Sequence, residues 1–264
     1  GYYPETNNDK KLAGSIYKPK GKDYDGDGTI DPYYDPTENR LLSFFGRANW
    51  SLMDSRYMLT ATFRADGSTR FNWLEPYPNQ QWGYFPSFAF AWRIKDEKKF
   101  KEMEWLSNLK LRLGYGQTGQ QEGIDDFGYY TSYTMNAGPD SYYPISGDGT
   151  MARPVAVNTS LTWETTTTYN IGLDWGIFNQ RLTGTVDWYY RKTTDLLNTV
   201  YVPAGANFKN TLRSNIGDMK NTGVEASFHW LALNTKDWNW TLDYNFTYNQ
   251  NSITKLTGGK DKGY

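Results

Sequence analysis

The chain of 264 residues has no cysteine, a single histidine and no long apolar run, and each shortage excludes a class of structure or site. Without cysteine there is no disulfide, no thiolate metal site and no thiol nucleophile. One histidine, His229, cannot make a HExxH zinc site, and we expect it to be an ordinary polar residue. No segment approaches the roughly 20 apolar residues that a membrane-spanning helix needs. The 28 basic and 29 acidic residues nearly cancel, which gives no reason to expect nucleic acid as a partner.

Aromatic side chains are abundant, at 17% of the chain, although the mean hydropathy is −0.77. The segment 238–249, WNWTLDYNFTYN, places its large apolar side chains at every second position. A strand sends successive side chains to opposite faces, so this segment predicts a strand with one aromatic face and one polar face. The aromatic face would meet a core in a soluble protein, or lipid in an outer-membrane barrel.

The same alternation predicts eight strands, at residues 42–52, 57–66, 82–94, 108–116, 161–178, 181–192, 213–231 and 238–250. Large aromatic and aliphatic side chains share one phase of these strands, and charged side chains fall on the other. We expect the charged phase to face a wet lumen, and its members include Arg47, Arg64, Arg93, Arg112, Asp174, Asp187 and Glu225.

The order of residues along the apolar phase favours lipid as its neighbour. Tryptophans such as Trp92 and Trp175 flank one set of turns, tyrosines such as Tyr115 and Tyr190 lie toward the other ends, and aliphatic residues lie between. Two aromatic girdles around an aliphatic band are typical of a membrane-spanning barrel. Alternate connections are short, and those between them, 65–81, 117–160 and 193–212, are long, as periplasmic turns and extracellular loops are.

These patterns predict an all-β fold: a section of an antiparallel transmembrane β-barrel, about eight strands of a larger barrel, with long extracellular loops. The expected organisation is an extracellular loop over 1–40, barrel strands and loops over 41–250, and the start of a further extracellular loop over 251–264. The charged segment 95–108 predicts a helical turn at the periplasmic rim, with Phe100, Met103 and Leu106 on one stripe.

Two short motifs could be mistaken for catalytic or cofactor sites. GYGQTG, Gly114 to Gly119, matches a dinucleotide-binding pattern, but a Gly- and Tyr-rich loop follows it instead of the helix that such a site needs, so we interpret it as glycines that end a strand. Asp125 and Asp126 are expected in a solvated loop. With no GxSxG elbow and no paired acid and base, the chain is not expected to be an enzyme.

DYDGDGTID has the spacing of a calcium-binding loop, in which Gly28 allows the sharp turn. The glutamate expected at its twelfth position is replaced by Tyr34, so an acidic turn without metal remains the alternative. The predicted Ca²⁺ ligands are Asp23, Asp25, Asp27, Thr29 and Asp31. The longest loop contains tyrosines that could stack on a sugar or grip a partner, or could only pack the loop: Tyr129, Tyr130, Tyr133, Tyr142 and Tyr143.

Six segments in order resemble the SusC and RagA type of TonB-dependent outer-membrane transporter of Bacteroidetes. They are SFFGRANW, LTATFRADGSTRF, GYFPSFAFAWRI, LSNLKLRLGYGQTG, LTWETTTTYNIGLDWGIFNQRLTGTVDWYYRKTTDLL and NIGDMKNTGVE, with Gln120 where the family pattern suggests Asn. The resemblance runs from about Leu41 to Gln250. It implies import of an oligosaccharide or peptide across the outer membrane of a Gram-negative bacterium, with a SusD-type lipoprotein outside and TonB acting through a plug domain. It also implies a barrel of roughly 22 strands, of which this chain would supply a middle or late section.

Two other functions are compatible with the sequence. A self-contained eight-stranded outer-membrane barrel could act as an adhesin or anchor, although the charged inward positions suit a wide channel better than a filled interior. A soluble sugar-binding β-sandwich would bury the aromatic face against a second sheet.

Overall fold

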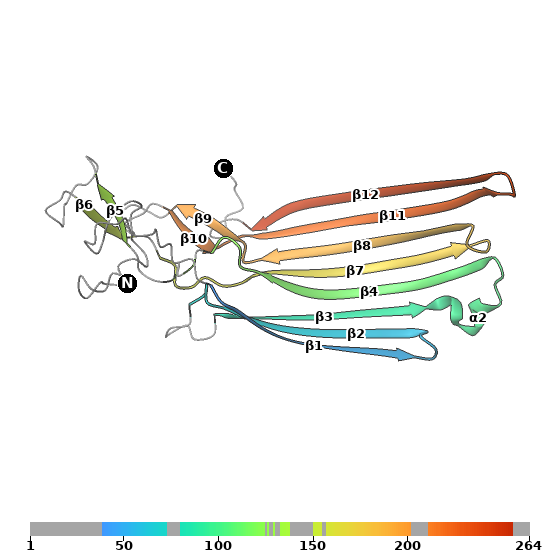
Figure 1. The fold of residues 1–264 in the computed structure, drawn as a ribbon, viewed down its shortest axis with the longest axis horizontal. Coiled ribbons are helices and arrows are strands. Elements are labelled where there is room, and N and C mark those ends of the chain that lie inside the picture. The colour runs from blue at the N-terminus through green and yellow to red at the C-terminus, as the bar shows by residue number, and fades with distance from the viewer. Residues whose placement is uncertain are drawn as a thin grey trace, which may run out of the picture.

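Long antiparallel strands dominate the computed structural model, which describes residues 39–72, 80–124, 126, 129, 157–201 and 211–255, and the backbone of 133–137 and 150–154. Eight strands form one sheet in the order β1-β2-β3-β4-β7-β8-β11-β12, so each strand lies beside its neighbours in sequence (Figure 1). Their bounds are β1 Leu41–Leu52, β2 Tyr57–Ser68, β3 Trp82–Arg93, β4 Leu106–Gln120, β7 Glu164–Ile177, β8 Leu182–Thr194, β11 Asp218–Asn234 and β12 Asn239–Lys255.

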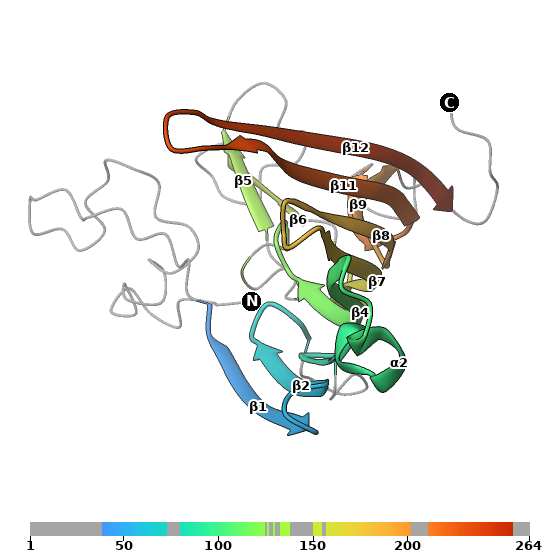
Figure 2. The ribbon, with the colours of Figure 1, turned by 90° about the vertical axis from the view of Figure 1, so that its right-hand side faces the viewer.

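The sheet is a curved arc that does not close (Figure 2). β1 pairs only with β2, and β12 pairs only with β11, so each end strand has a free edge in the described part of the chain. Unpaired backbone groups at a sheet edge are costly in lipid, where water is absent. In the described part of the chain the sheet stays open at both edges.

The eight predicted strands are confirmed, with ends that differ by a few residues. The largest difference is at the predicted strand 213–231, which is interrupted at Gly217, where φ is +124°. Residues before this glycine form β10, Thr211–Asn215, which pairs with β9, Leu197–Tyr201, in a separate hairpin. A second separate hairpin, β5 Tyr133–Ala137 with β6 Thr150–Pro154, was not predicted either.

The helical turn predicted within 95–108 is present but shorter than the predicted stripe, which extended to Leu106. Only η1, Ile94–Asp96, and α2, Lys98–Lys101, are helical, and Leu106 is a buried residue of β4. Lys95 explains the short helix, because its ammonium donates hydrogen bonds to the carbonyls of Phe100 and Met103 at 3.0 and 2.8 Å and so caps the chain where it leaves α2. No helix among the described residues has the length and apolar character needed to cross a membrane.

One face of the arc carries exposed apolar side chains along its whole length, and we call it the aromatic face. Cross-strand rings form rows on it: Tyr115 and Tyr169 have centroids 5.3 Å apart, and Tyr169 and Tyr190 6.4 Å. The Trp175 side chain lies over Gly184 of β8, where an added Cβ would be 2.6 Å from the indole ring. The ring centroids of Trp175 and Phe228 are 5.9 Å apart. In the described part of the chain no second layer covers these rings, as a β-sandwich would require.

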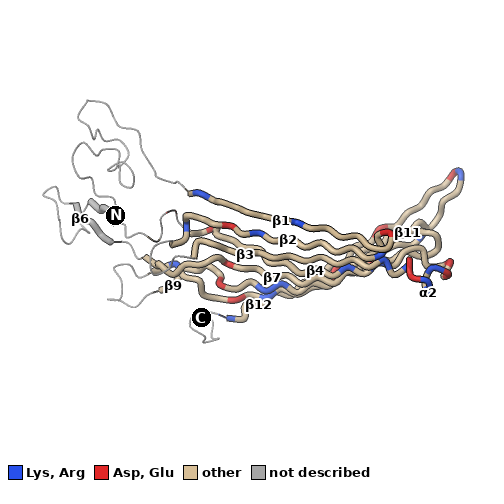
Figure 3. The backbone as a smooth tube through the Cα atoms, turned by 90° about the horizontal axis from the view of Figure 1, so that it is seen from below, with Lys and Arg blue, Asp and Glu red and all other residues tan. Residues whose placement is uncertain are grey.

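The two ends of the arc are built differently. At the short-turn end, Met53–Ser55 and Phe178–Gln180 connect β1 to β2 and β7 to β8, each with three consecutive positive φ angles. At the other, long-loop end, the chain leaves the sheet for the connections that contain the two small hairpins (Figure 1). Lys, Arg, Asp and Glu are spaced along the strands and gather at the short-turn end around α2 (Figure 3).

The buried core lies at the long-loop end, on the face opposite the aromatic one. Phe71, Phe85, Ile124, Leu161 and Trp163 form it, and Phe71 is fully buried. Phe85 of β3 fits over Gly119 of β4, where an added Cβ would collide with its ring. Gly119, the last glycine of GYGQTG, therefore has a packing role close to the end of β4, which extends to Gln120.

Candidate functional site: the polar face of the arc

The candidate site is the face opposite the aromatic one, which we call the polar face. The cross-strand register places the seven residues predicted to face a lumen on this face: Arg47, Arg64, Arg93, Arg112, Asp174, Asp187 and Glu225. Lys110, Arg191 and Asp243 share it, between hydroxyl and amide side chains. The alternation of each strand therefore separates an apolar surface from a charged one across the thickness of a single sheet.

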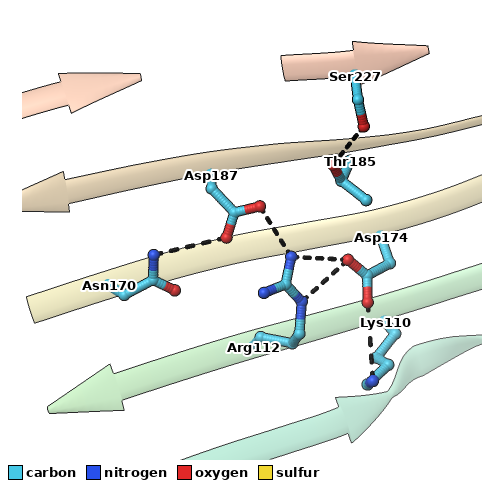
Figure 4. A network of polar contacts seen from close by, with 7 residues as sticks. All are labelled: Lys110, Arg112, Asn170, Asp174, Thr185, Asp187 and Ser227. Carbon is cyan, nitrogen blue, oxygen red and sulfur yellow. Dashed lines mark hydrogen bonds and ion pairs between the residues drawn. The ribbon is translucent and has the colours of Figure 1, made fainter. Parts of the chain in front are cut away.

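A network of ion pairs occupies the centre of the polar face (Figure 4). The Arg112 guanidinium donates to Asp174 Oδ1 and to Asp187 Oδ2, each at 2.9 Å, and so joins β4 to β7 and β8. Lys110 Nζ lies 3.7 Å from Asp174 Oδ2, and the Asn170 amide donates to Asp187 at 3.5 Å. The two cations and two carboxylates balance each other, so the network adds no net charge to the face.

Gly172 provides the space for this network. It lies opposite Arg112 on one side and Asp187 on the other, and a Cβ there would be 2.4 Å from Asp187 Oδ1 and 2.7 Å from the Arg112 guanidinium. A side chain at this position would push the arginine away from its carboxylates. The glycine is thus a steric requirement of the ion pairs, and sequence alternation alone does not reveal it.

Several charged side chains of the polar face have no ion-pair partner among the described residues. Arg47 of β1, Arg191 of β8 and Glu225 of β11 are exposed, and Glu225 lies directly opposite Asp187, whose charge is already taken by Arg112. Arg64 instead pairs with Asp66 at 2.9 Å. The unpartnered charges are available to a molecule or a further protein segment inside the arc.

His229 and Asp243 form a separate contact nearer the short-turn end. His229 Nδ1 lies 2.7 Å from Asp243 Oδ1, across β11 and β12. Together with Asn245, Ser227 and Asp174 they line a polar hollow of about 400 Å³. The described residues contain no group of three or more His, Asp or Glu that could hold a metal ion, and His229 is a polar residue of the face, as predicted.

At the short-turn end of β2 and β3, one carboxylate connects several side chains. Glu97 accepts hydrogen bonds from Tyr57 Oη at 2.5 Å and Trp92 Nε1 at 3.1 Å, and lies 3.5 Å from Arg56. The Tyr57 bond, then the Trp92 bond, and a smaller attraction to Arg56 lower the pKa of Glu97 from its usual value. This residue fastens the α2 segment to the aromatic girdle at the short-turn end.

Several predicted site residues lie outside the described part of the chain. These are the five calcium-loop residues Asp23, Asp25, Asp27, Thr29 and Asp31, and the loop tyrosines Tyr130, Tyr142 and Tyr143, so their roles stay predictions. Tyr133 is in β5, where only the backbone is described. Tyr129 is 7% exposed, which favours the packing role that we set beside its binding role.

Asp126 differs from the prediction of a solvated loop residue. Its carboxylate accepts a hydrogen bond from Arg70 Nε at 2.9 Å, and both side chains are mostly buried. The pair holds the loop after β4 against the loop after β2, beside the buried core. Neither residue shows this pairing in the sequence, because 56 positions separate them.

Comparison with known proteins shows the family to which this chain belongs. Residues 2–264 match the family described as TonB dependent receptor-like, beta-barrel, and the chain belongs to this family of outer-membrane β-barrel proteins. The aromatic face is the surface that such a barrel turns to lipid.

Individual relatives place the chain nearer to one branch. The TonB-dependent receptor SusC of Bacteroides thetaiotaomicron is 49% identical over 234 residues, which are 86% of this chain and 22% of the relative. The TonB-dependent receptor P39 of Formosa agariphila is 35% identical over 224 residues, 84% of this chain and 20% of the relative. The chain therefore spans about a fifth of the length of these relatives, and it is a SusC-like receptor section.

Solved structures agree with this placement. The RagAB peptide importer in its open-open state superimposes with a TM-score of 0.72 at 34% identity, covering 84% of this chain and 23% of that chain. The siderophore receptor PirA from Pseudomonas aeruginosa shares the fold, with a TM-score of 0.51 at 15% identity.

Proposed function

We propose that this chain is a section of the barrel wall of a transporter that imports oligosaccharides or peptides across the outer membrane. A SusD-type surface lipoprotein would close the outside, and TonB would act through a plug domain inside the completed barrel. Support comes from family membership, from 49% identity to a SusC receptor and from the superposition on a peptide importer. Outer-membrane barrels have short turns on the periplasmic side and long loops on the outside. We therefore assign the short-turn end to the periplasm and the long-loop end to the extracellular side.

The observation that carries the proposal is the division of one sheet into two surfaces with different solvents. The aromatic face is suited to lipid, whereas the polar face holds ion pairs and hydroxyls that need water or protein beside them. Such a polar face suits a wide lumen that encloses a plug and a passing substrate.

The small closed barrel is a weaker candidate. β1 and β12 would have to pair to close eight strands, but they are at opposite ends of the arc and each has a free edge (Figure 2). An eight-stranded barrel also fills its interior with side chains. Here Arg47, Arg191 and Glu225 are exposed on the polar face, which suits a partner or substrate within a larger lumen.

Transport can be tested with the whole outer-membrane protein that contains this chain. Cells with and without its gene would be given labelled oligosaccharides and labelled peptides, and uptake would be followed before and after collapse of the proton gradient. We expect saturable uptake of one class that stops when the gradient collapses. Uptake of neither class, or uptake that ignores the gradient, contradicts the proposal. Co-purification of a surface lipoprotein after mild cross-linking tests the expected partner.

Calcium is a separate proposal that rests on the loop spacing from Asp23 to Asp31. Oxygen ligands at alternate positions around Gly28 would bind Ca²⁺ more weakly than a complete loop, because the glutamate at the twelfth position is missing. Calorimetric titration should give calcium-dependent heat in the parent protein and less in Asp25→Ala. Equal heat in both proteins, or none in the parent, removes the proposal.

A further inference from the structure

Two lysines with no ion-pair partner among the described residues break the pattern of the aromatic face near the long-loop end. Lys192 of β8 and Lys220 of β11 are direct cross-strand neighbours, and both are exposed. Like charges that face each other across two strands destabilise a sheet. An anion between the two ammonium groups would remove this repulsion.

The surroundings of the pair suggest which anion this is. The tyrosine row Tyr115, Tyr169 and Tyr190 lies two residues, about 7 Å, closer to the membrane centre than the lysines. Two residues further along the strands, the side chains are aliphatic or indole, as at Leu113, Ile171 and Trp188. Tyrosine rings mark the depth of the lipid headgroups on a membrane barrel. The lysines are therefore just outside the hydrocarbon, at the level of headgroup phosphates.

The flanking residues supply neutral hydrogen-bond donors. Thr167 of β7 lies opposite Lys192, and Ser252 of β12 lies opposite Lys220, so the row reads hydroxyl, ammonium, ammonium, hydroxyl. The nearest acid on this side, Asp218, lies two residues beyond Lys220 and is opposite Lys255. The local charge stays positive.

We propose that Lys192 and Lys220 clamp the phosphate of a lipid headgroup in the outer leaflet, with Thr167 and Ser252 at its sides. Because the inference needs the aromatic face to touch lipid, it rests on the proposed barrel function. The clamp would fix the depth and rotation of this part of the wall in the leaflet that surrounds the extracellular loops.

The test uses the whole outer-membrane protein in nanodiscs of phosphatidylcholine with a small fraction of phosphatidic acid, whose headgroup is a bare phosphate. Native mass spectrometry would count the phosphatidic acid retained as the nanodisc is stripped. Each lysine changed to glutamine should weaken retention about fivefold, and K192Q/K220Q about thirtyfold. K192R/K220R should retain the lipid.

The matched control is R47Q/R191Q, which removes two exposed positive charges from the polar face, one of them at the residue next to Lys192. It should retain phosphatidic acid as the parent does. Equal loss of phosphatidic acid in both double variants would show general charge attraction and overturn the clamp. If soluble glycerol phosphate displaces the retained phosphatidic acid at an equal concentration, the site binds a free anion, which also overturns the clamp. Failure of substrate uptake in the parent contradicts the transport proposal alone, because lipid retention is measured without substrate.

Discussion

The two faces of the arc share a backbone but stabilise it by different means. On the aromatic face, contacts are ring on ring and no ion pair is found among the described residues, whereas on the polar face Arg112 links three strands through two carboxylates. Neighbouring residues such as Thr185 and Val186 are in these two environments although one peptide bond separates them. Solvent, and not strand propensity, therefore decides which residue types each position accepts.

The largest expected effect is the difference in stability cost between truncating a buried residue of the core and truncating an exposed apolar residue of the polar face. Phe71→Ala should destabilise the long-loop end by about 3–5 kcal/mol, because Phe71 is fully buried in the core. Phe45→Ala, also on the polar face but 74% exposed, should change stability by less than about 0.5 kcal/mol. Hydrogen exchange of the backbone around Trp163 measures both. Similar exchange in the two variants would show that the core does not hold the loops.

The next largest effect is the difference in cost between placing an arginine on the aromatic face and placing one on the polar face, at the same depth in the membrane. Val186→Arg, on the aromatic face, should cost about 2–4 kcal/mol in a bilayer near its midplane. Thr185→Arg, on the polar face, should cost less than about 1 kcal/mol, because water and Asp187 are nearby. Urea unfolding in lipid vesicles measures the difference. A larger cost for Thr185→Arg would reverse the assignment of the faces.

Removing the central arginine tests the network itself. Arg112→Met should destabilise the protein by about 1–2 kcal/mol, because Asp174 and Asp187 lose a charged donor while remaining partly hydrated. Gly172→Ala should act in the same direction by displacing the guanidinium. The double variant should cost little more than Arg112→Met alone, since both changes break one contact. Additive costs would mean that Gly172 acts elsewhere.

The smallest effect is a pH dependence at the short-turn end, around α2. The pKa of Glu97 is lowered in the folded protein, so its contribution is fully present above the usual value of 4.5 and is lost as the pH falls through the lowered pKa. The protection factor of the α2 amides, which is the intrinsic exchange rate divided by the observed rate, should therefore fall below pH 4.5 in the parent. Glu97→Gln should show the low protection factor at every pH. A protection factor in the parent that stays constant down to the acid limit contradicts the role of this carboxylate.

Much of the sheet could be predicted because each strand alternates between lipid and water, which is a strong and local signal. The prediction failed where the constraint is not local. Gly217 ends a pattern that continues through it, and the small hairpins have too few residues to alternate clearly. The hydrogen bonds of Lys95 to the carbonyls after α2, which limit the helix, depend on three-dimensional proximity.

The polar face was predictable in composition but not in pairing. Alternation places Arg112, Asp174 and Asp187 on one side, yet the choice of partners depends on register, which no single strand encodes. The buried core shows the same limit, although a signal was present. Gly83 and Gly119 in neighbouring strands mark room for a large side chain, and Phe85 fills it.

The claim on which the other inferences depend is that lipid touches the aromatic face and water the polar face. Because the chain has no cysteine, single cysteines can be placed at residues 183–188 of β8 and spin-labelled in the membrane-embedded protein. We predict that labels at the even positions collide with oxygen dissolved in lipid and that labels at the odd positions collide with a water-soluble nickel chelate. Equal access of the chelate to both sets, or the opposite alternation, would contradict the assignment.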